Sequence, residues 1–127
     1  MVSAAPVIRM VISREVSDCG LVALSMYTGV SYEDVLRATT LTDRKHGKDG
    51  LWTKTMQRIA KRLGHPLKLR TRIDWESDYG ILRLPEHCVV LRNGLAIEVD
   101  GTIWDAEDCL ASWHVDQRDC QILMAGD

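Results

Sequence analysis

Residues 17–27 read SDCGLVALSMY and predict a buried helix that begins near Cys19. Asp18 lies just before it, where a carboxylate can accept hydrogen bonds from the backbone N–H groups two and three residues further on. The residues after Gly20 are apolar on nearly every face, which is typical of a central helix covered on all sides. Gly29 then offers the left-handed conformation in which helices commonly end.

The position of Cys19 at the start of this helix favours a thiolate. The positive end of the helix dipole and the outward-pointing N–H groups stabilise negative charge there, and the thiolate is the nucleophilic form of cysteine. The alternative is a small buried hydrophobic residue without chemistry. This helix alone does not separate the two interpretations.

The composition predicts one soluble domain. A chain of 127 residues can bury a single core, so the whole range 1–127 is expected to form one domain. No apolar run approaches the length of a membrane span, and residues 1–10 lack the pattern of a secretory signal. The four cysteines show no CxxC spacing, which favours reduced thiols and a cytoplasmic location over a disulfide framework.

The net charge of −2 hides a marked asymmetry. Residues 43–72 carry ten bases and two acids, whereas residues 73–127 carry three bases and twelve acids. A basic face can attract an acidic partner or a nucleic acid. Such a stretch is more often a solvated helix face that pairs with acids of the same fold, so nucleic acid is not the expected partner.

Further helices and strands follow from periodicity and turn signals. Ser31 is predicted to cap a helix that runs to about Thr39. A helix at about 52–63 carries one apolar stripe opposite its bases, and Asp105 precedes a short helix at 106–113. Strands are predicted at 7–12, 67–70, 81–84, 87–92, 95–100 and 120–124.

The dipeptide Asn93-Gly94 is a strong signal for a two-residue hairpin between residues 87–92 and 95–100. A type I′ turn fixes the register of the two strands. Counting the pairs back from the turn, His87 faces Asp100. Directly opposed side chains share one face and lie about 5 Å apart at Cβ, so the hairpin predicts an imidazole beside a carboxylate.

Cys19, His87 and Asp100 together suit a nucleophilic triad. His87 would take the thiol proton and return it to the leaving group, while Asp100 would orient the imidazole and stabilise its charged form. Cys19 would attack a carbonyl and form an acyl-enzyme, with its own backbone N–H as one oxyanion donor. The alternative for the His–Asp pair is a stabilising contact within a sheet.

The remaining histidines and cysteines carry less chemistry. His46 and His65 lie in basic, loop-like sequence and are expected in solvent. His114 follows the last predicted helix and suits an interaction with its C-terminus. A metal site from Cys88, Cys109, His114 and Cys120 would not match zinc-finger spacings, so neither a metal nor a cofactor is expected.

Asp18 to Met26, followed by Gly29, resembles the DCGxAALxM…G nucleophile motif of the C39 peptidases. These are papain-like cysteine peptidases, best known as leader-cleaving domains of bacteriocin exporters and also found as free-standing domains. The resemblance continues through residues 50–64, the H-x-V-V-L strand at 87–91 and the helix at 105–113. It therefore covers nearly the whole chain in order.

Two features depart from the family pattern. The family usually has a glutamine about six residues before the cysteine as a side-chain oxyanion donor, and that position is Ser13 here. Loss of one oxyanion donor typically costs about 10²–10³ in rate. The exporter is absent from this sequence, so cleavage of double-glycine leaders is not implied.

The resemblance implies an α+β, papain-like (C39-type) fold with a helical half packed on an antiparallel sheet. It implies a cysteine peptidase or thiol hydrolase that cleaves a peptide or isopeptide bond through Cys19, His87 and Asp100, without a cofactor. Two alternatives stay open. One is a catalytically weak or inactive domain that binds a peptide or protein, which Ser13 favours, and the other is amidase or transglutaminase-like chemistry. The oligomeric state is also open.

Overall fold

The computed structural model of the protein describes residues 19–40, 43, 52–85 and 87–126. The predicted strand at 7–12, the predicted cap Asp18 and Ser13 lie outside this part of the chain. The elements run in the order α1 (Cys19–Thr28), α2 (Tyr32–Ala38), α4 (Trp52–Arg62), β1 (Leu67–Arg70), β2 (Tyr79–Leu84), β3 (His87–Arg92), β4 (Leu95–Ile97), β5 (Ile103–Asp105), α5 (Ala106–Ser112), a short 3₁₀ helix (Gln117–Asp119) and β6 (Gln121–Ala125).

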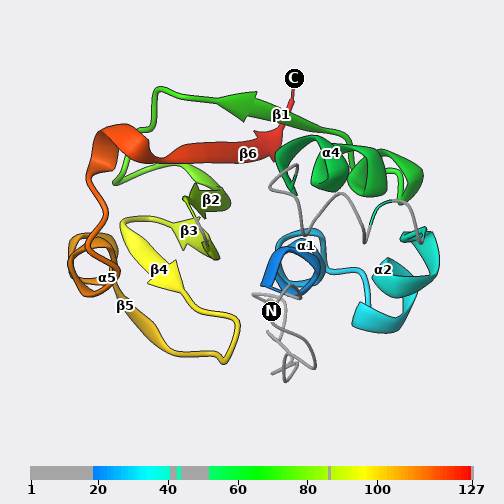
Figure 1. The fold of residues 1–127 in the computed structure, drawn as a ribbon, viewed down its shortest axis with the longest axis horizontal. Helices are drawn as coiled ribbons and strands as arrows, with labels where there is room; N and C mark the ends of the chain where they lie inside the picture. Colours follow the sequence, from blue (N-terminus) through cyan, green and yellow to red (C-terminus); the bar gives the residue numbers. More distant parts are fainter. Residues whose placement is uncertain (1–18, 41–42, 44–51, 86, 127) are drawn as a thin grey trace.

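One six-stranded antiparallel sheet organises the described residues, with strand order β1-β6-β2-β3-β4-β5 (Figure 1). The last strand of the chain, β6, inserts between β1 and β2. The central strands β2 and β3 are apolar and buried at most positions, as expected for strands covered on both faces. The α+β class predicted from the sequence is confirmed.

Helices cover both faces of this sheet (Figure 1). On one face, α1, α2 and α4 pack against side chains such as Ile81, Cys88 and Val90. On the other face, α5 packs against the alternate residues, among them Leu82 and Val89. The period-two alternation of each strand therefore divides the interior into two apolar cores. Among the helices whose bounds are given above, α1 is the one buried most completely.

Local signals in the sequence are mostly borne out. The hydroxyl of Ser31 accepts a hydrogen bond from the backbone N–H of Asp34 at 3.2 Å and caps α2. The hairpin turn has positive φ at both Asn93 (50°) and Gly94 (80°), as a type I′ turn requires. Around that turn, Arg92 pairs with Leu95 and the register is the predicted one.

The predicted strand at 95–100 is too long. β4 ends at Ile97, and the chain turns immediately afterwards. The backbone N–H of Gly101 donates to the carbonyl of Glu98 at 2.9 Å, and the N–H of Glu98 donates to the carbonyl of Thr102 at 2.8 Å. This tight turn leads straight into β5, so Asp100 lies in the turn and not on a strand.

Two bases of the basic segment are used inside the fold. The carboxylate of Asp43, whose side chain is 2% exposed, accepts from Arg62 at 2.5 Å and from Arg58 at 3.5 Å. Arg62 also donates to the carbonyl of Ala38 at 2.9 Å, which ties α4 to the end of α2. This agrees with the expectation that part of the segment pairs with acids of the same fold.

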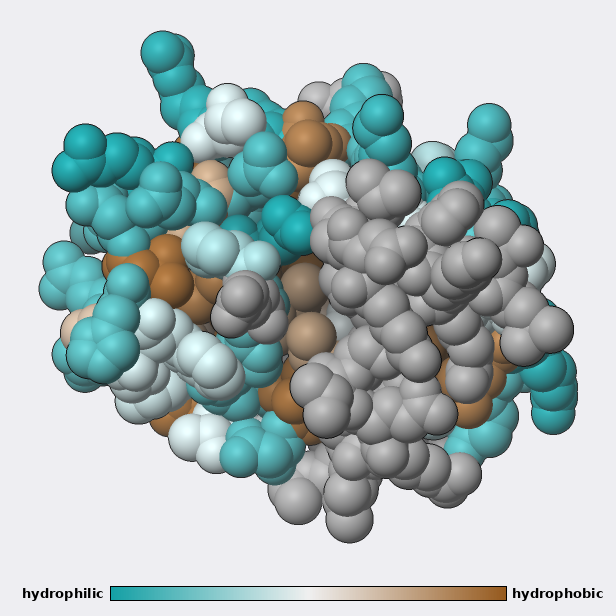
Figure 2. All heavy atoms as spheres, viewed as in Figure 1, coloured by the Kyte–Doolittle hydropathy of each residue, from teal (hydrophilic) through white to brown (hydrophobic). Residues whose placement is uncertain are grey.

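The described surface is mostly hydrophilic in the view of Figure 2, with hydrophobic side chains exposed only in small areas. The large apolar residues that are exposed include Leu95, Ile103 and Trp113. None of the helices in the described part of the chain has the length and apolar character needed to cross a bilayer.

Candidate active site

The start of α1 and the start of β3 meet and bring Cys19 to His87. Cys19 is the first described residue of α1, and α1 lies against β3 (Figure 1). Its partly buried thiol hydrogen bonds to the side chains of both His87 and Cys88, the first two residues of β3. Two of the three predicted triad residues are therefore in contact, although 68 positions separate 19 from 87 in the sequence.

His87 pairs with a carboxylate that lies inside the fold. Its Nε2 atom is 2.5 Å from Oε1 of Glu98, and the two side chains are only 11% and 12% exposed. The indole N–H of Trp113 donates to the other oxygen of Glu98 at 3.1 Å. The Trp113 ring also stacks on His87, with centroids 4.1 Å apart and planes inclined by 25°. The imidazole is thus held by an ion pair on its edge and a ring on its face.

The structure gives His87 a different carboxylate from the one predicted. Asp100 is exposed, and its carboxylate accepts from the backbone N–H of Thr102 at 2.9 Å. The reason is the early end of β4 at Ile97, which removes Asp100 from the extrapolated register. Glu98 lies two residues before Asp100, so its side chain points to the same face of the hairpin. It is diagonally opposite His87, at a separation that a long side chain can span.

Glu98 is buried and Asp100 is exposed, and the sequence contains features that indicate this difference. Glu98 follows directly on the apolar strand β4, whereas Asp100 belongs to an Asp-Gly turn, which is usually exposed. A tryptophan late in the chain supplies the second partner of Glu98. Neither feature predicts that β4 ends after three residues. The position of that end decides whether Glu98 or Asp100 reaches the imidazole of His87.

The site strongly favours the thiolate of Cys19. Its pKa is lowered to about 5, first by the hydrogen bond from the Cys88 thiol, against the opposing effect of burial, and then by the hydrogen bond and charge of His87. Cys88 is fully enclosed between the sheet and α1, and its contact with Cys19 raises its own pKa well above the usual value. Cys88 therefore remains a thiol and acts as a donor, a role that the sequence analysis missed.

His87 is held in its protonated form. Burial would lower its pKa, but the hydrogen bonds to Cys19 and Glu98, together with their negative charges, raise it to about 9. Between about pH 5 and pH 9 the pair is consequently a thiolate beside an imidazolium. Since Glu98 occupies Nε2, Nδ1 is the ring nitrogen left for Cys19.

A backbone donor is available beside the nucleophile. The first N–H groups of a helix have no partner within the helix, and within the described part of α1 the N–H of Cys19 belongs to this first turn. Such a group can stabilise the oxyanion of a tetrahedral intermediate. The expected side-chain donor position, Ser13, lies outside the described residues.

The other candidate residues do not join the site. His65 and His114 are exposed, and His46 lies outside the described residues. Cys109 and Cys120 are buried in the core on the α5 face, where burial raises the pKa of each to about 11. The sheet separates them from Cys88, and no group of three or more His, Cys, Asp or Glu residues in the described ranges is arranged to hold a metal.

Comparisons with protein-family models, curated proteins and solved structures give no match to this chain. The functional argument therefore depends on the geometry of the site itself.

Proposed function

We propose that this protein is a thiol hydrolase that cleaves a peptide or isopeptide bond by acyl transfer to Cys19. The observation that carries the proposal is the buried chain of contacts from Cys19 through His87 to Glu98. A nucleophile, a base in contact with it and a third group that orients the base form the arrangement expected for covalent acyl-transfer catalysis. Glu98 takes the place that the sequence analysis assigned to Asp100.

The first half of the reaction uses the ion pair as it stands. The Cys19 thiolate attacks the carbonyl carbon of the amide, and a C–S bond forms. Protonated Nδ1 of His87 gives its proton to the amide nitrogen as the C–N bond breaks, so the amine leaves neutral and a thioester remains. In this reaction the backbone N–H of Cys19, in the first described turn of α1, stabilises the oxyanion between these steps.

The second half restores the resting pair. Neutral His87 takes a proton from water, and the resulting hydroxide attacks the thioester carbonyl. The C–S bond then breaks, which releases a carboxylic acid and returns Cys19 as a thiolate beside an imidazolium. Glu98 stays ionised throughout and holds the ring orientation through Nε2.

The resemblance of the Cys19 and His87 segments to the C39 peptidases supports the same chemistry. The antiparallel sheet with α1 on one face is compatible with such a fold. Amidase and transglutaminase-like reactions use the same first step and differ only in the acyl donor or in the group that accepts the acyl chain.

The test is the pH dependence of alkylation of each cysteine by iodoacetamide, mapped by mass spectrometry in the parent protein and in His87→Ala. We expect Cys19 in the parent to react half-maximally near pH 5, whereas Cys109 and Cys120 require a pH near 11. In His87→Ala the Cys19 midpoint should move toward that of an ordinary thiol. Acetylation of Cys19 by p-nitrophenyl acetate, lost in the same variant, would then establish acyl transfer.

A parent Cys19 that reacts only at the pH of an ordinary thiol would contradict the proposal. In that event the ion pair does not form, and the alternative of a peptide-binding domain becomes the better description. Cys109 and Cys120 serve as internal controls because both are buried and neither contacts His87.

A further inference from the structure

Cys19 and Cys88 form a pair of contacting thiols at the candidate active site. The two side chains are hydrogen bonded to each other, and Cys19 packs against the core cluster that contains Cys88. In the proposed hydrolysis Cys19 is the nucleophile, whereas Cys88 only donates a hydrogen bond. Two sulfurs in contact have a second chemistry, because a two-electron oxidation can join them as a disulfide.

The two thiols differ in the way that a peroxide-reactive pair requires. Cys19 is partly exposed, and its thiolate is the form of cysteine that attacks peroxide. Cys88 is buried and stays protonated, so peroxide from solution oxidises Cys19 first. An accessible thiolate with a second thiol against it is the arrangement found in redox-sensing cysteines.

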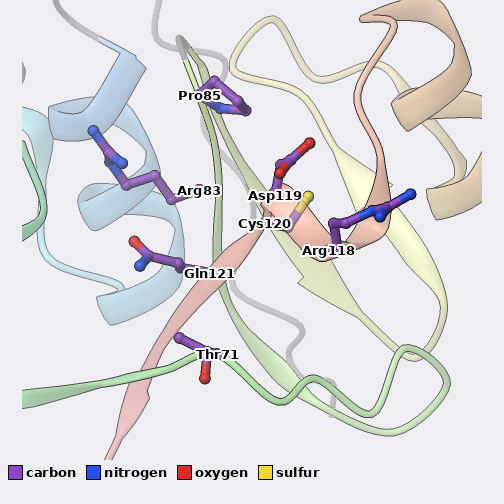
Figure 3. A pocket seen from close by; sticks show the side chains of 7 residues that line it. All are labelled: Thr71, Arg83, Pro85, Arg118, Asp119, Cys120 and Gln121. Carbon is purple, nitrogen blue, oxygen red and sulfur yellow. The ribbon is translucent and has the colours of Figure 1, made fainter.

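The two cysteines on the other side of the sheet provide an internal comparison. Cys109 and Cys120 lie in the core on the α5 face. Cys120 lines a pocket of about 400 Å³ beside Arg118 and Asp119 (Figure 3). Burial and, after it, the charge of Asp119 raise the pKa of Cys120 to about 11, and burial raises the pKa of Cys109 to the same value. We therefore expect both to stay reduced where the active-site thiolate is oxidised.

The oxidation consists of two balanced steps. The Cys19 thiolate attacks one oxygen of hydrogen peroxide and the O–O bond breaks. The departing hydroxide takes the proton of His87, so that a sulfenic acid and water result. The sulfur of Cys88 then attacks the sulfur of the sulfenic acid, an S–S bond forms, and the hydroxyl group leaves with the Cys88 proton as a second water. The two cysteines lose two electrons in total, and the peroxide gains them.

The first step favours the second. The pKa of Cys88 is raised first by its hydrogen bond to the Cys19 thiolate, then by burial and by the thiolate charge. A sulfenic acid carries no such charge, so two of these three effects end when Cys19 is oxidised. Cys88 thus becomes the better nucleophile when its partner becomes an electrophile. Since the two side chains already touch across α1 and β3, the S–S bond of about 2.0 Å closes by local side-chain movement.

We infer that Cys19 and Cys88 form a redox-modification site, at which peroxide converts the nucleophile and its donor into a reversible disulfide. The disulfide removes the thiolate that the proposed hydrolysis needs, and a dithiol restores it by exchange. Cys88 also protects Cys19, because a sulfenic acid without a second thiol is oxidised further to a sulfinic acid that thiols do not reduce. The loss of activity rests on the proposed function, whereas formation of the disulfide does not.

Peroxide treatment followed by peptide mapping tests this inference. The parent protein is treated with a small excess of hydrogen peroxide at neutral pH, the remaining thiols are blocked with N-ethylmaleimide, and the protein is digested without reductant. We expect a linked Cys19–Cys88 peptide, while Cys109 and Cys120 carry the block. Alkylation of Cys19 by iodoacetamide should fall in proportion to the linked peptide, and dithiothreitol should restore it.

Cys88→Ser separates the second sulfur from the donor. The hydroxyl keeps a donor beside Cys19 but cannot form a disulfide, so the same treatment should give a sulfinic acid at Cys19 that dithiothreitol does not reverse. Cys109→Ser is the matched control, because it makes the same change at another buried cysteine, and it should form the linked peptide as the parent does. The map of the parent needs no variant, so it decides the question even where Cys88→Ser does not fold.

Three results would overturn the inference: equal conversion of Cys19 to sulfinic acid in the parent and in Cys88→Ser, a disulfide between the Cys19 residues of two molecules, or a Cys19 that stays reduced. The proposed function fails separately. A linked peptide in a protein whose Cys19 is not acetylated by p-nitrophenyl acetate would leave the redox site and remove the hydrolase. Acetylation without a linked peptide would do the reverse.

Discussion

The substitution Glu98→Gln isolates the group that keeps His87 protonated. Glutamine has nearly the same shape as glutamate but no charge, so the contact at 2.5 Å to Nε2 changes from an ion pair to a neutral hydrogen bond. We expect the pKa of His87 to fall from about 9, because one of the two partners that raise it is lost. The pKa of Cys19 should rise in turn, because a less stable imidazolium supports its thiolate less well.

The magnitude follows from the geometry. An opposite charge within a few ångströms typically moves a pKa by about 1–3. Since both side chains are close to 90% buried, we take about two pH units, or roughly 2.7 kcal/mol of imidazolium stabilisation. In the parent protein, thiolate and imidazolium coexist between about pH 5 and pH 9. In Glu98→Gln the upper limit of this pH range should fall, because it is set by the pKa of His87.

The assay is NMR titration of the protein with ¹³C-labelled histidine. The signal of His87 is assigned by its loss in His87→Ala. Asp100→Asn is the matched control, since it removes the same charge two residues along the chain from an exposed side chain that binds Thr102. Its carboxylate acts on His87 only weakly and over a distance, so the midpoint should stay near 9.

The reverse result would refute this description of the site. If Glu98→Gln leaves the titration of His87 unchanged while Asp100→Asn lowers it, the hairpin register continues to Asp100 in solution. The pairing predicted from the sequence would then be the correct one.

Three further substitutions test other parts of the structure. Trp113→Phe keeps a ring over His87 but removes the N–H donor of Glu98, and we expect acetylation of Cys19 by p-nitrophenyl acetate to slow about tenfold. Gly80→Ala places a Cβ 2.6 Å from a backbone carbonyl oxygen of β6, so the free energy of unfolding in urea should fall by about 1–3 kcal/mol. Met56→Ala opens a cavity at a fully buried position and should lower the same free energy by about 2–5 kcal/mol.

Met56→Ala has a control on the same helix, and each of the three substitutions has a result that would contradict it. Lys54→Ala, on the exposed side of α4, should change stability by no more than about 0.5 kcal/mol. Equal losses for Lys54→Ala and Met56→Ala would contradict the assigned packing of α4. Unchanged stability in Gly80→Ala would mean that β2 and β6 lie further apart than described. An unchanged acetylation rate in Trp113→Phe would mean that the indole N–H does not help Glu98 to orient His87.

The local features of this protein are readable from its sequence. The cap at Ser31, the type I′ turn at Asn93-Gly94, the apolar stripe of α4 and the apolar helix after Cys19 are all short-range patterns, and the described structure contains each of them. They depend on backbone preferences and on the periodicity of burial, which a few neighbouring residues determine. The approach of Cys19 to His87 was predicted from their roles and is present as a contact.

Only the tertiary structure decided which groups complete the site. The hairpin register was correct next to the turn, but β4 stops at Ile97 because the chain folds back into β5 there, and Glu98 rather than Asp100 reaches the imidazole. The donor role of Cys88 and the stacking of Trp113 likewise arise from elements far apart in the chain. Sequence patterns specify the face on which a side chain lies, whereas strand ends, side-chain reach and burial are set by packing between distant elements.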